Sequence, residues 1–279
     1  MTATKEQPFV NSLGMKFVPV PITGGRSVLF CVWQTRVQDF RAFATDRIGN
    51  SNWDYQKGPE PMMLMLKGNG WSTRGRDYGW QKCGFEQTDT HPVVCVSWMD
   101  AKAFCAWLTK KERLPDGWSY RLPTDAEWST AVGLHETITG TPKDKDSQIF
   151  GVYPWGTQWP PPDGAGNYGG VEERTADMPQ NAPVIDGYRD KFPRTSPVGS
   201  FSANQYGLYD MGGNVKEHCE DLSEGKSDHH VCRGASWHET SPRELLSSNR
   251  KYTDPDHRGS DYGFRCVLAP ASSTPPAVK

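Results

Sequence analysis

Two carboxylates, Asp210 and Glu217, flank a Gly-Gly pair in the segment DMGGNVKE at residues 210–217. Calcium takes about six to eight oxygen ligands from carboxylates, amides and backbone carbonyls. A glycine pair can turn tightly and aim carbonyls inward, because glycine adopts conformations closed to other residues. The pattern therefore indicates a calcium site. The alternative is that Asp210 and Glu217 only cap turns and pair with nearby arginines.

The cysteines give no comparable metal pattern. There are seven, with no CxxC and no Cys/His spacing typical of zinc. Buried thiols are the expected state in a reducing compartment. Two disulfides stay open as alternatives, Cys105–Cys266 and Cys219–Cys232, because distances decide which cysteines can be bridged.

Other catalytic patterns are missing from the sequence. It contains no Gly-rich phosphate loop, nucleophile elbow or HExxH. His229 and His230 are adjacent, so on a strand they would face opposite ways and not share one metal. His238 and His257 are the pair that an active-site loop could bring together, although exposed polar loop residues are the favoured interpretation. Ser236 has no placed base and receives no nucleophilic role.

Residues 237–262 mix polar, charged and aromatic side chains without a period. Such a mixture on a rigid scaffold suits recognition. Within it, residues 245–250 (LLSSNR) are predicted to be structural. An ordinary solvated loop is the alternative. The predicted ligand-binding residues are Trp237, His238, Glu239, Thr240, Ser241, Arg243, Lys251, Tyr252, Thr253, Asp254, Asp256, His257, Ser260, Asp261 and Tyr262.

Short strands and helices must position these residues. Apolar runs predict strands, and apolar residues at positions 101, 104, 105 and 108 predict a helix. Ser97 and Thr124 are N-cap candidates, because Asp100 and Glu127 follow them three residues later. Residues 46–90 and 140–200 lack a period and are expected to be long ordered loops. The expected strands are 15–22, 28–34, 91–96, 231–237 and 263–268; the expected helices are 35–45, 98–112 and a short one from 125.

Composition narrows the class of protein. The chain has 279 residues, a formal net charge of -2, 11 Trp, 28 Gly and 22 Pro. These totals favour one loop-rich domain over residues 11–270, with a flexible N-terminus (1–10) and a tail (271–279). A near-neutral charge argues against nucleic-acid binding. No run is long enough to span a membrane and no secretion signal is visible, so we expect a cytoplasmic monomer, with surface display through another factor left open.

Several motifs occur in an order that resembles the formylglycine-generating enzyme, or sulfatase-modifying factor, family. They are NSLGMKFVPVP, HPVVCVSWMDAKAFCAWL, RLPTDAEW, YPWG, NQYGLYDMGGNVKE, RGASW and GFRC. The resemblance covers residues 10–270. It implies an α+β fold related to C-type lectins, with long loops and little regular secondary structure.

The resemblance also implies two calcium ions and their ligands. One ion would be held by the side chains of Asp210 and Glu217 and the carbonyls of Gly213 and Val215. The second would use Asn167, Tyr168, Asp186 and Tyr188. Such an ion would close the long 140–200 loop.

The oxidase activity of the resembled family is not supported. Its copper is held by two cysteines, five residues apart, just after the RGGS-like strand, and thiolates suit Cu(I). Here no cysteine lies between Cys232 and Cys266, and Lys216 and His218 replace usual tryptophans. Cys232 and Cys266 could form a substitute copper pair, but two buried thiols in neighbouring strands are the favoured interpretation. An iron-dependent branch of the family takes ligands from a helical domain that this sequence lacks.

The segment 237–262 also resembles the variable region of lectin-fold proteins diversified by retroelements. We therefore expect a calcium-stabilised, non-catalytic module that presents this segment to a protein or other ligand, without copper or iron. The alternative is a metal-dependent oxidoreductase of the same superfamily with altered ligands.

Overall fold

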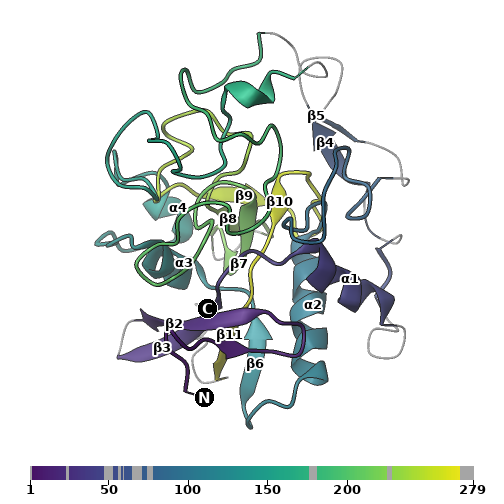
Figure 1. The fold of residues 1–279 in the computed structure, drawn as a ribbon. Coiled ribbons are helices and arrows are strands. Elements are labelled where there is room, and N and C mark those ends of the chain that lie inside the picture. Colours follow the sequence, from purple (N-terminus) through teal and green to yellow (C-terminus); the bar gives the residue numbers. More distant parts are fainter. Residues whose placement is uncertain are drawn as a thin grey trace.

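The computed structural model describes residues 2–22, 25–46, 53–55, 58, 60–64, 71–73, 78–175, 181–224 and 228–270. Its largest element is a five-stranded sheet in the order β1-β2-β3-β11-β6. These strands are β1 (Phe9–Val10), β2 (Lys16–Ile22), β3 (Arg26–Cys31), β6 (Trp118–Arg121) and β11 (Val267–Pro270). β11 pairs antiparallel with both β3 and β6, so the C-terminal strand lies inside a sheet begun at the N-terminus (Figure 1).

Alternation of side chains along these strands separates two cores. Leu29 and Cys31 of β3 face one core, while Val28 and Phe30 face the other. The same period of two on β11 sends Leu268 to the first core, because successive strand residues point to opposite faces. The sheet is therefore buried on both faces.

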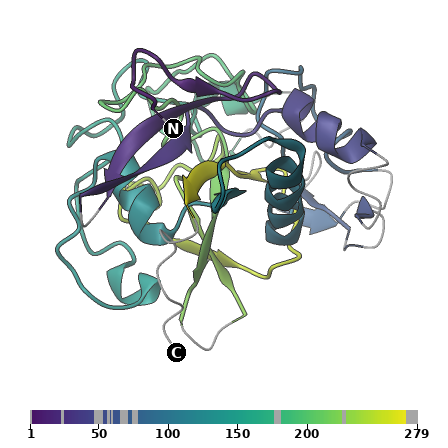
Figure 2. The ribbon, with the colours of Figure 1, turned by 90° about the horizontal axis from the view of Figure 1, so that it is seen from below.

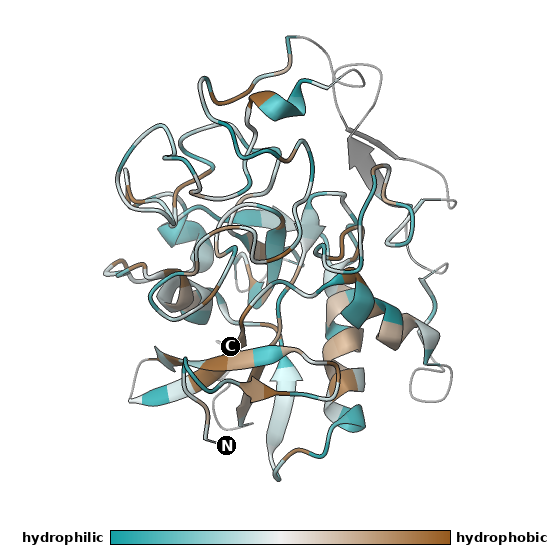
Figure 3. Cartoon of the chain, in the orientation of Figure 1, coloured by the Kyte–Doolittle hydropathy of each residue, from teal (hydrophilic) through white to brown (hydrophobic). Residues whose placement is uncertain are grey.

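The first face is covered by α1 (Val37–Thr45) and α2 (Trp98–Lys111), and the second is packed by α3 (Asp125–Val132). Viewed from below, α1 and α2 lie on one side of the molecule, and α3 and α4 (Pro142–Lys145) on the other (Figure 2). Figure 3 shows apolar residues gathered on the lower sheet and helices, whereas the upper loops are mostly polar.

Capping boxes fix the starts of α2 and α3, as their sequences predicted. The Ser97 hydroxyl accepts from the Asp100 amide at 3.1 Å, and the Asp100 carboxylate accepts from the Ser97 amide at 2.9 Å. Thr124 and Glu127 repeat this exchange at 3.2 and 2.9 Å. Each exchange satisfies amides that a helix start otherwise leaves unpaired.

A second sheet of four strands, in the order β10-β7-β8-β9, lies above the first (Figure 1). Its members are β7 (Lys216–Leu222), β8 (His230–Arg233), β9 (Lys251–Thr253) and β10 (Tyr262–Gly263). β10 runs parallel to β7, and the other pairs are antiparallel. The structure also describes the antiparallel pair β4 (Met62–Leu64) and β5 (Trp71–Thr73), and a 3-10 turn, η2 (Val171–Glu173).

Three sequence expectations need correction. Residues 91–96 form no strand; Val93, Val94 and Val96 are fully buried, but Cys95 has a left-handed φ of 57° that interrupts extended pairing. The expected strand 263–268 is divided between β10 and β11, which belong to different sheets. β1 also extends the sheet into the segment expected to be a flexible N-terminus, while the expected tail 271–279 lies outside the described residues.

Among the described residues, no helix is both long and apolar enough to cross a membrane.

Candidate functional site

A polar pocket of about 410 Å³ opens where the second sheet meets the loop that follows β8. β7 contributes Lys216, β9 contributes Lys251 and β10 contributes Tyr262, so the sheet forms one wall. The remaining wall comes from loops: Pro183, His238, Glu239, Thr240, Glu244, His257, Gly259 and Asp261.

Lys216 lies at the base of this pocket, almost fully buried. Its ammonium contacts the carboxylates of Glu239 and Asp261 and lies 4.8 Å from the centre of the Tyr262 ring. Burial alone would lower the pKa of Lys216, but the two carboxylates raise it well above its ordinary value. Lys216 is therefore a fixed positive charge and not a nucleophilic amine.

Glu239 is held from several sides. One carboxylate oxygen accepts from the Ser236 amide at 2.8 Å and also contacts the Ser236 hydroxyl, while the other contacts Lys216. Burial would raise the pKa of Glu239, but Lys216 and the Ser236 hydroxyl lower it to about 2. Glu239 is thus ionised and fixed in place.

A second ion pair stands at the rim. Lys251 lies 2.5 Å from a carboxylate oxygen of Glu244, and both side chains are about one-third exposed. Solvent screens such a pair, so its contribution to stability is small, on the order of 0.2–1 kcal/mol. A ligand can exchange partners with it at low cost.

Two histidines complete the wall. His238 contacts Glu173 through Nδ1; burial would lower the pKa of His238, but Glu173 raises it. The His257 ring lies 5.0 Å from Tyr262, and burial lowers the pKa of His257. Both line the same pocket, which was the less favoured of the two interpretations from sequence, and the described residues contain no group of three or more His, Cys, Asp or Glu arranged to hold a metal.

Of the residues predicted to bind ligand, seven line the pocket: His238, Glu239, Thr240, Lys251, His257, Asp261 and Tyr262. The others do not. Trp237 is buried beneath Arg194 and Phe85, and Thr253 and Ser260 are also buried. Tyr252 packs against the core on the α3 side of the first sheet. Arg243, Asp254 and Asp256 are exposed outside the pocket, and Ser241 is half-buried outside it.

Sequence reasoning missed four lining residues, Lys216, Glu244, Pro183 and Gly259. Lys216 carried a usable signal, since a lysine stands there in place of the tryptophan usual in the resembled family. Glu244 is five residues after Glu239, the same separation expected of the copper cysteines. Both glutamates line the pocket.

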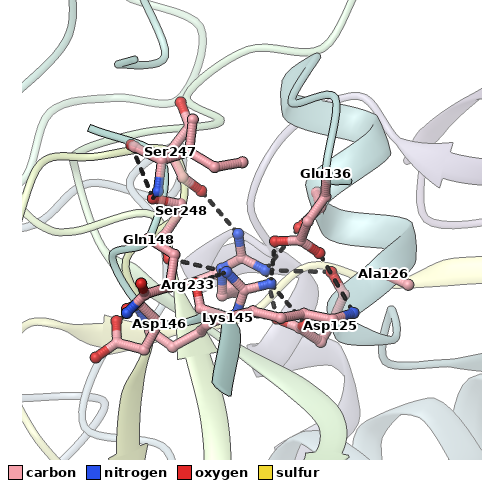
Figure 4. Close-up of polar contacts among 12 residues, drawn as sticks. Asp125, Ala126, Glu136, Lys145, Asp146, Gln148, Arg233, Ser247 and Ser248 are labelled. Carbon is pink, nitrogen blue, oxygen red and sulfur yellow. Dashed lines mark hydrogen bonds and ion pairs between the residues drawn. The ribbon is translucent and has the colours of Figure 1, made fainter. Parts of the chain in front are cut away.

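A buried ion cluster fixes β8, just before the segment 237–262, and the middle of that segment (Figure 4). Asp125, at the start of α3, contacts the Arg233 guanidinium and lies 2.9 Å from Arg250. Arg233 donates to the Ser247 carbonyl at 2.7 Å, and Arg250 donates to the Ser248 carbonyl at 2.8 Å. Although burial would raise the pKa of Asp125, the two arginines lower it. The LLSSNR stretch is structural, as predicted.

The cysteines show no disulfide and no exposed thiolate. All seven lie among the described residues as buried free thiols. The Sγ atoms of Cys105 and Cys266 are 3.5 Å apart, and Cys232 Sγ lies 3.2 Å from His218 Nδ1. Burial raises the pKa of Cys232 to about 12. Cys232 and Cys266 thus contact different partners and do not form a copper pair with each other.

The carbonyls of residues 210, 213 and 215 and the Glu217 carboxylate form a cage around a side-chain amide. The Asp210 side chain, which the resemblance implied as a ligand, instead accepts from the Gly199 amide through one oxygen, and its buried Oδ1 has no partner. Gln34 Nε2 lies 3.2 Å from the Asp210 and Val215 carbonyl oxygens and 3.3 Å from that of Gly213. It also lies 3.2 Å from Glu217 Oε1. Arg265 pairs with the same carboxylate, at 2.7 Å to Oε1 and 2.8 Å to Oε2. As arranged here, this cage does not fit a calcium ion. Glu217 instead pairs with an arginine, which was the alternative to a calcium ligand.

The second implied site has a different carboxylate from the one expected. Asp186 lies in an exposed turn, and its carboxylate makes no hydrogen bond to Asn167 or Tyr168. Asp190 takes its place: one oxygen accepts from the Tyr168 amide at 2.9 Å and the other from the Phe192 amide at 2.8 Å. Tyr188 is buried and its hydroxyl contacts the backbone of Gly166.

Two groups at this corrected site have the chemistry of cation ligands. Asn167 donates through Nδ2 to the Arg194 carbonyl at 2.8 Å, which fixes its amide, and its buried Oδ1 has no hydrogen-bond partner. Burial raises the pKa of Asp190 to about 7, and Glu172 and Glu173 add to the effect. Within the described part of the chain Asp190 has no ion pair. A cation would satisfy both groups.

The fold and the site define an α+β domain of the C-type-lectin type with an acidic-basic pocket in its second sheet. A family model, the sulfatase-modifying factor enzyme 1-like domain, matches residues 6–270. The chain belongs to this family.

Its relatives include both sequence and structural matches. The inactive C-alpha-formylglycine-generating enzyme 2 of Bos taurus is 34% identical over 190 residues, which cover 66% of this chain and 52% of that protein. The chain spans about half the length of the first curated relatives it matches.

Two solved structures share the fold. PvdO from Pseudomonas aeruginosa aligns with a TM-score of 0.58 at 22% identity, covering 94% of this chain and 97% of that chain. Treponema denticola variable protein 1 aligns with a TM-score of 0.55 at 18% identity, covering 94% and 98%. These likenesses confirm the predicted α+β, lectin-like fold.

Proposed function

We propose that this domain is a non-oxidase binding module that presents the pocket and the segment 237–262 to a ligand, with calcium closing its long loop. The observation that carries the proposal is the pair Glu239 and Glu244. They follow β8 with the spacing expected of a copper-binding cysteine pair, and each has a lysine against it.

The charges of the pocket support binding over redox chemistry. Carboxylates paired with ammonium groups are poor ligands for Cu(I), which prefers sulfur. The buried thiols nearby have raised pKa values, as Cys232 shows, so few thiolates form at neutral pH. Ser236 has Glu239 as its partner, and the low pKa of Glu239 makes it a weak base for activating a hydroxyl.

The lining also favours a ligand of particular polarity. Three carboxylates, Glu239, Glu244 and Asp261, face two ammonium groups, Lys216 and Lys251. A surplus of negative charge attracts cations and hydrogen-bond donors. We therefore expect a peptide or other ligand with basic groups to bind better than an acidic one.

The calcium part of the proposal rests on Asn167 and Asp190. An ion bound there would join residues 167–168 to residues 190–192 and so shorten the free loop that follows α4. It would act on structure only, because neither residue lines the pocket.

The likeness to a variable protein extends the proposal. On the shared lectin-like fold, residues 238–244 and 251–262 would be the part of the surface that varies between copies of such a module. The Arg233 and Arg250 contacts with Asp125 support this division, because they hold the frame below both stretches.

A defined peptide array tests the binding function. Purified full-length chain would be applied to arrayed peptides of matched length that are basic, acidic or neutral. We expect basic peptides to be retained, and retention to fall at least tenfold in Glu244→Ala. The matched control is Asp254→Ala, which removes an exposed carboxylate outside the pocket. No retained peptide, or equal loss in both variants, would contradict the proposal.

A separate measurement tests the oxidase alternative. Oxygen consumption would be followed after loading with copper or iron, using a cysteine-containing peptide as substrate. We expect no consumption above that of the free metal, and no metal retained after gel filtration. One retained copper or iron per chain with peptide-dependent oxygen uptake would overturn the assignment as a non-oxidase.

A further inference from the structure

Gln34 lies at the point where an ion of the first calcium site would have to lie. The residue follows β3 and is completely buried. Its Nε2 is surrounded by four oxygens at 3.2–3.3 Å, from residues 210, 213, 215 and 217. Calcium binds oxygens at about 2.3–2.6 Å, so this cage is wider than an ion requires and has a nitrogen at its centre.

We infer that Gln34, together with Arg265, replaces the cation of this cage, so that the chain takes one calcium ion and not two. The inference rests on the proposed function only for the ion at Asp190. The replacement itself is argued from the contacts of Gln34 and Arg265.

The hydrogen bonds of the cage support the replacement. Gln34 Nε2 lies within 3.2–3.3 Å of all four oxygens, which share its two N–H groups, and two of the oxygens receive a further donor from Arg265: the Asp210 carbonyl at 3.1 Å and Glu217 Oε1 at 2.7 Å. The other oxygen of Glu217 accepts from Arg265 Nε and, at 3.0 Å, from Trp128 Nε1. The oxygens around Gln34 are thus already paired inside the protein, whereas Oδ1 of the Asp210 side chain is buried without a partner.

The charge balance points the same way. Glu217 and Arg265 are both almost fully buried, and their paired contacts neutralise each other. A divalent ion at the position of Gln34 would lie beside the guanidinium, and the repulsion between the two positive charges would make this cage a weaker ion site than the one at Asp190. The Asp190 site has no such guanidinium within the described residues.

One feature of Gln34 limits how well it replaces an ion. Its amide has two N–H groups for four acceptors, and its buried Oε1 has no partner. If the amide were turned over, Oε1 would face four oxygens, an arrangement that only a cation could stabilise. The competing outcome is that the wild type binds a second calcium ion with Gln34 Oε1 among its ligands.

Calcium content and thermal melting of four full-length proteins separate these outcomes. They are the wild type, Asp190→Asn, Gln34→Ala and the control Gln158→Ala, in which an exposed glutamine is removed. We expect one calcium per wild-type chain, none in Asp190→Asn, and no effect of Gln158→Ala.

Gln34→Ala should gain a calcium ion that the wild type does not bind. It empties the cage, so we expect it to melt several degrees lower in EDTA, to recover in calcium, and to bind one additional ion. Two ions in the wild type, or loss of an ion in Gln34→Ala, would overturn the inference.

A terbium titration of the wild type gives a second measurement in case Gln34→Ala fails to fold. Trp128 donates directly to Glu217, so an ion in the cage would show luminescence excited through tryptophan that Trp128→Phe reduces. We expect Trp128→Phe to leave the terbium signal unchanged; a reduced signal overturns the inference. A wild type without any ion, combined with a gain in Gln34→Ala, would support the role of Gln34 and contradict the calcium part of the proposed function.

Discussion

Asp190 and Glu217 are both buried carboxylates close to glycine-rich backbone, yet their environments differ in the source of positive charge. Glu217 receives a buried guanidinium and two further donors from the protein. Asp190 receives only backbone amides, and burial raises its pKa to about 7. Two buried carboxylates can thus differ in their pairing: Glu217 is neutralised by Arg265, whereas Asp190 has no ion pair among the described residues.

Removal of Arg265 should give the largest effect. Arg265→Met leaves the buried Glu217 carboxylate without its partner, which costs about 3–5 kcal/mol of unfolding free energy. Because Gln34 still fills the cage, calcium should restore little of this loss. Urea unfolding in EDTA and in calcium would measure both.

The double variant Glu217→Gln, Arg265→Met serves as the control for that loss. It removes the uncompensated charge and should recover part of the stability. Equal instability of the single and double variants would show that the ion pair is not what distinguishes this cage.

Asp190 should make the stability of the calcium-free protein depend on pH. A carboxyl whose pKa rises from 3.8 when unfolded to about 7 when folded binds its proton more tightly in the folded state. Stability should therefore fall as pH rises from about 4 to 7, by at most about 1.4 kcal/mol per pH unit. Melting in EDTA across this range would show it.

Asp190→Asn is the reference for that experiment, because Asp210 and Asp221 also have pKa values raised to about 6 by burial. The difference between wild type and variant isolates Asp190. Calcium should abolish the difference in slope for the wild type, since the ion favours the ionised carboxylate. Identical pH profiles of wild type and variant in EDTA would contradict the assignment.

The smallest effect is expected from Asp210→Asn. Asparagine keeps an oxygen for the Gly199 amide, now 2.7 Å from Asp210, and tolerates the left-handed φ of 53°. Unfolding free energy should change by less than about 1 kcal/mol, with unaltered calcium content. Loss of an ion in this variant, measured by mass spectrometry, would mean that the two sites are alike after all.

Local signals allowed much of the fold to be predicted. The capping pairs Ser97/Asp100 and Thr124/Glu127 act within one helical turn, so sequence alone places both helix starts. The strand prediction for residues 91–96 was wrong because a short apolar run in sequence is typical of a buried strand. The sequence gives no sign of the left-handed backbone at Cys95.

The site was harder to predict because its geometry depends on distant segments. Asp186-Gly187-Tyr188 and Asp190-Lys191-Phe192 have the same Asp-X-aromatic spacing, and only the folded loop shows which carboxylate turns inward. Gln34 carried no signal at all, since its partners lie more than 170 residues away in the chain. Lys216 was visible as a departure from the family pattern, but its two carboxylate partners were not.

The shared attachment of Arg233 and Arg250 to Asp125 has a consequence for chain entropy. β9 divides the connection between β8 and β10 into two loops, and the cost of closing each loop grows with the logarithm of its length. The attachment fixes the LLSSNR stretch at the end of the first loop, directly before β9, and so shortens the free part of that loop. Insertions or deletions in one loop are then local events, and the other loop keeps its starting geometry.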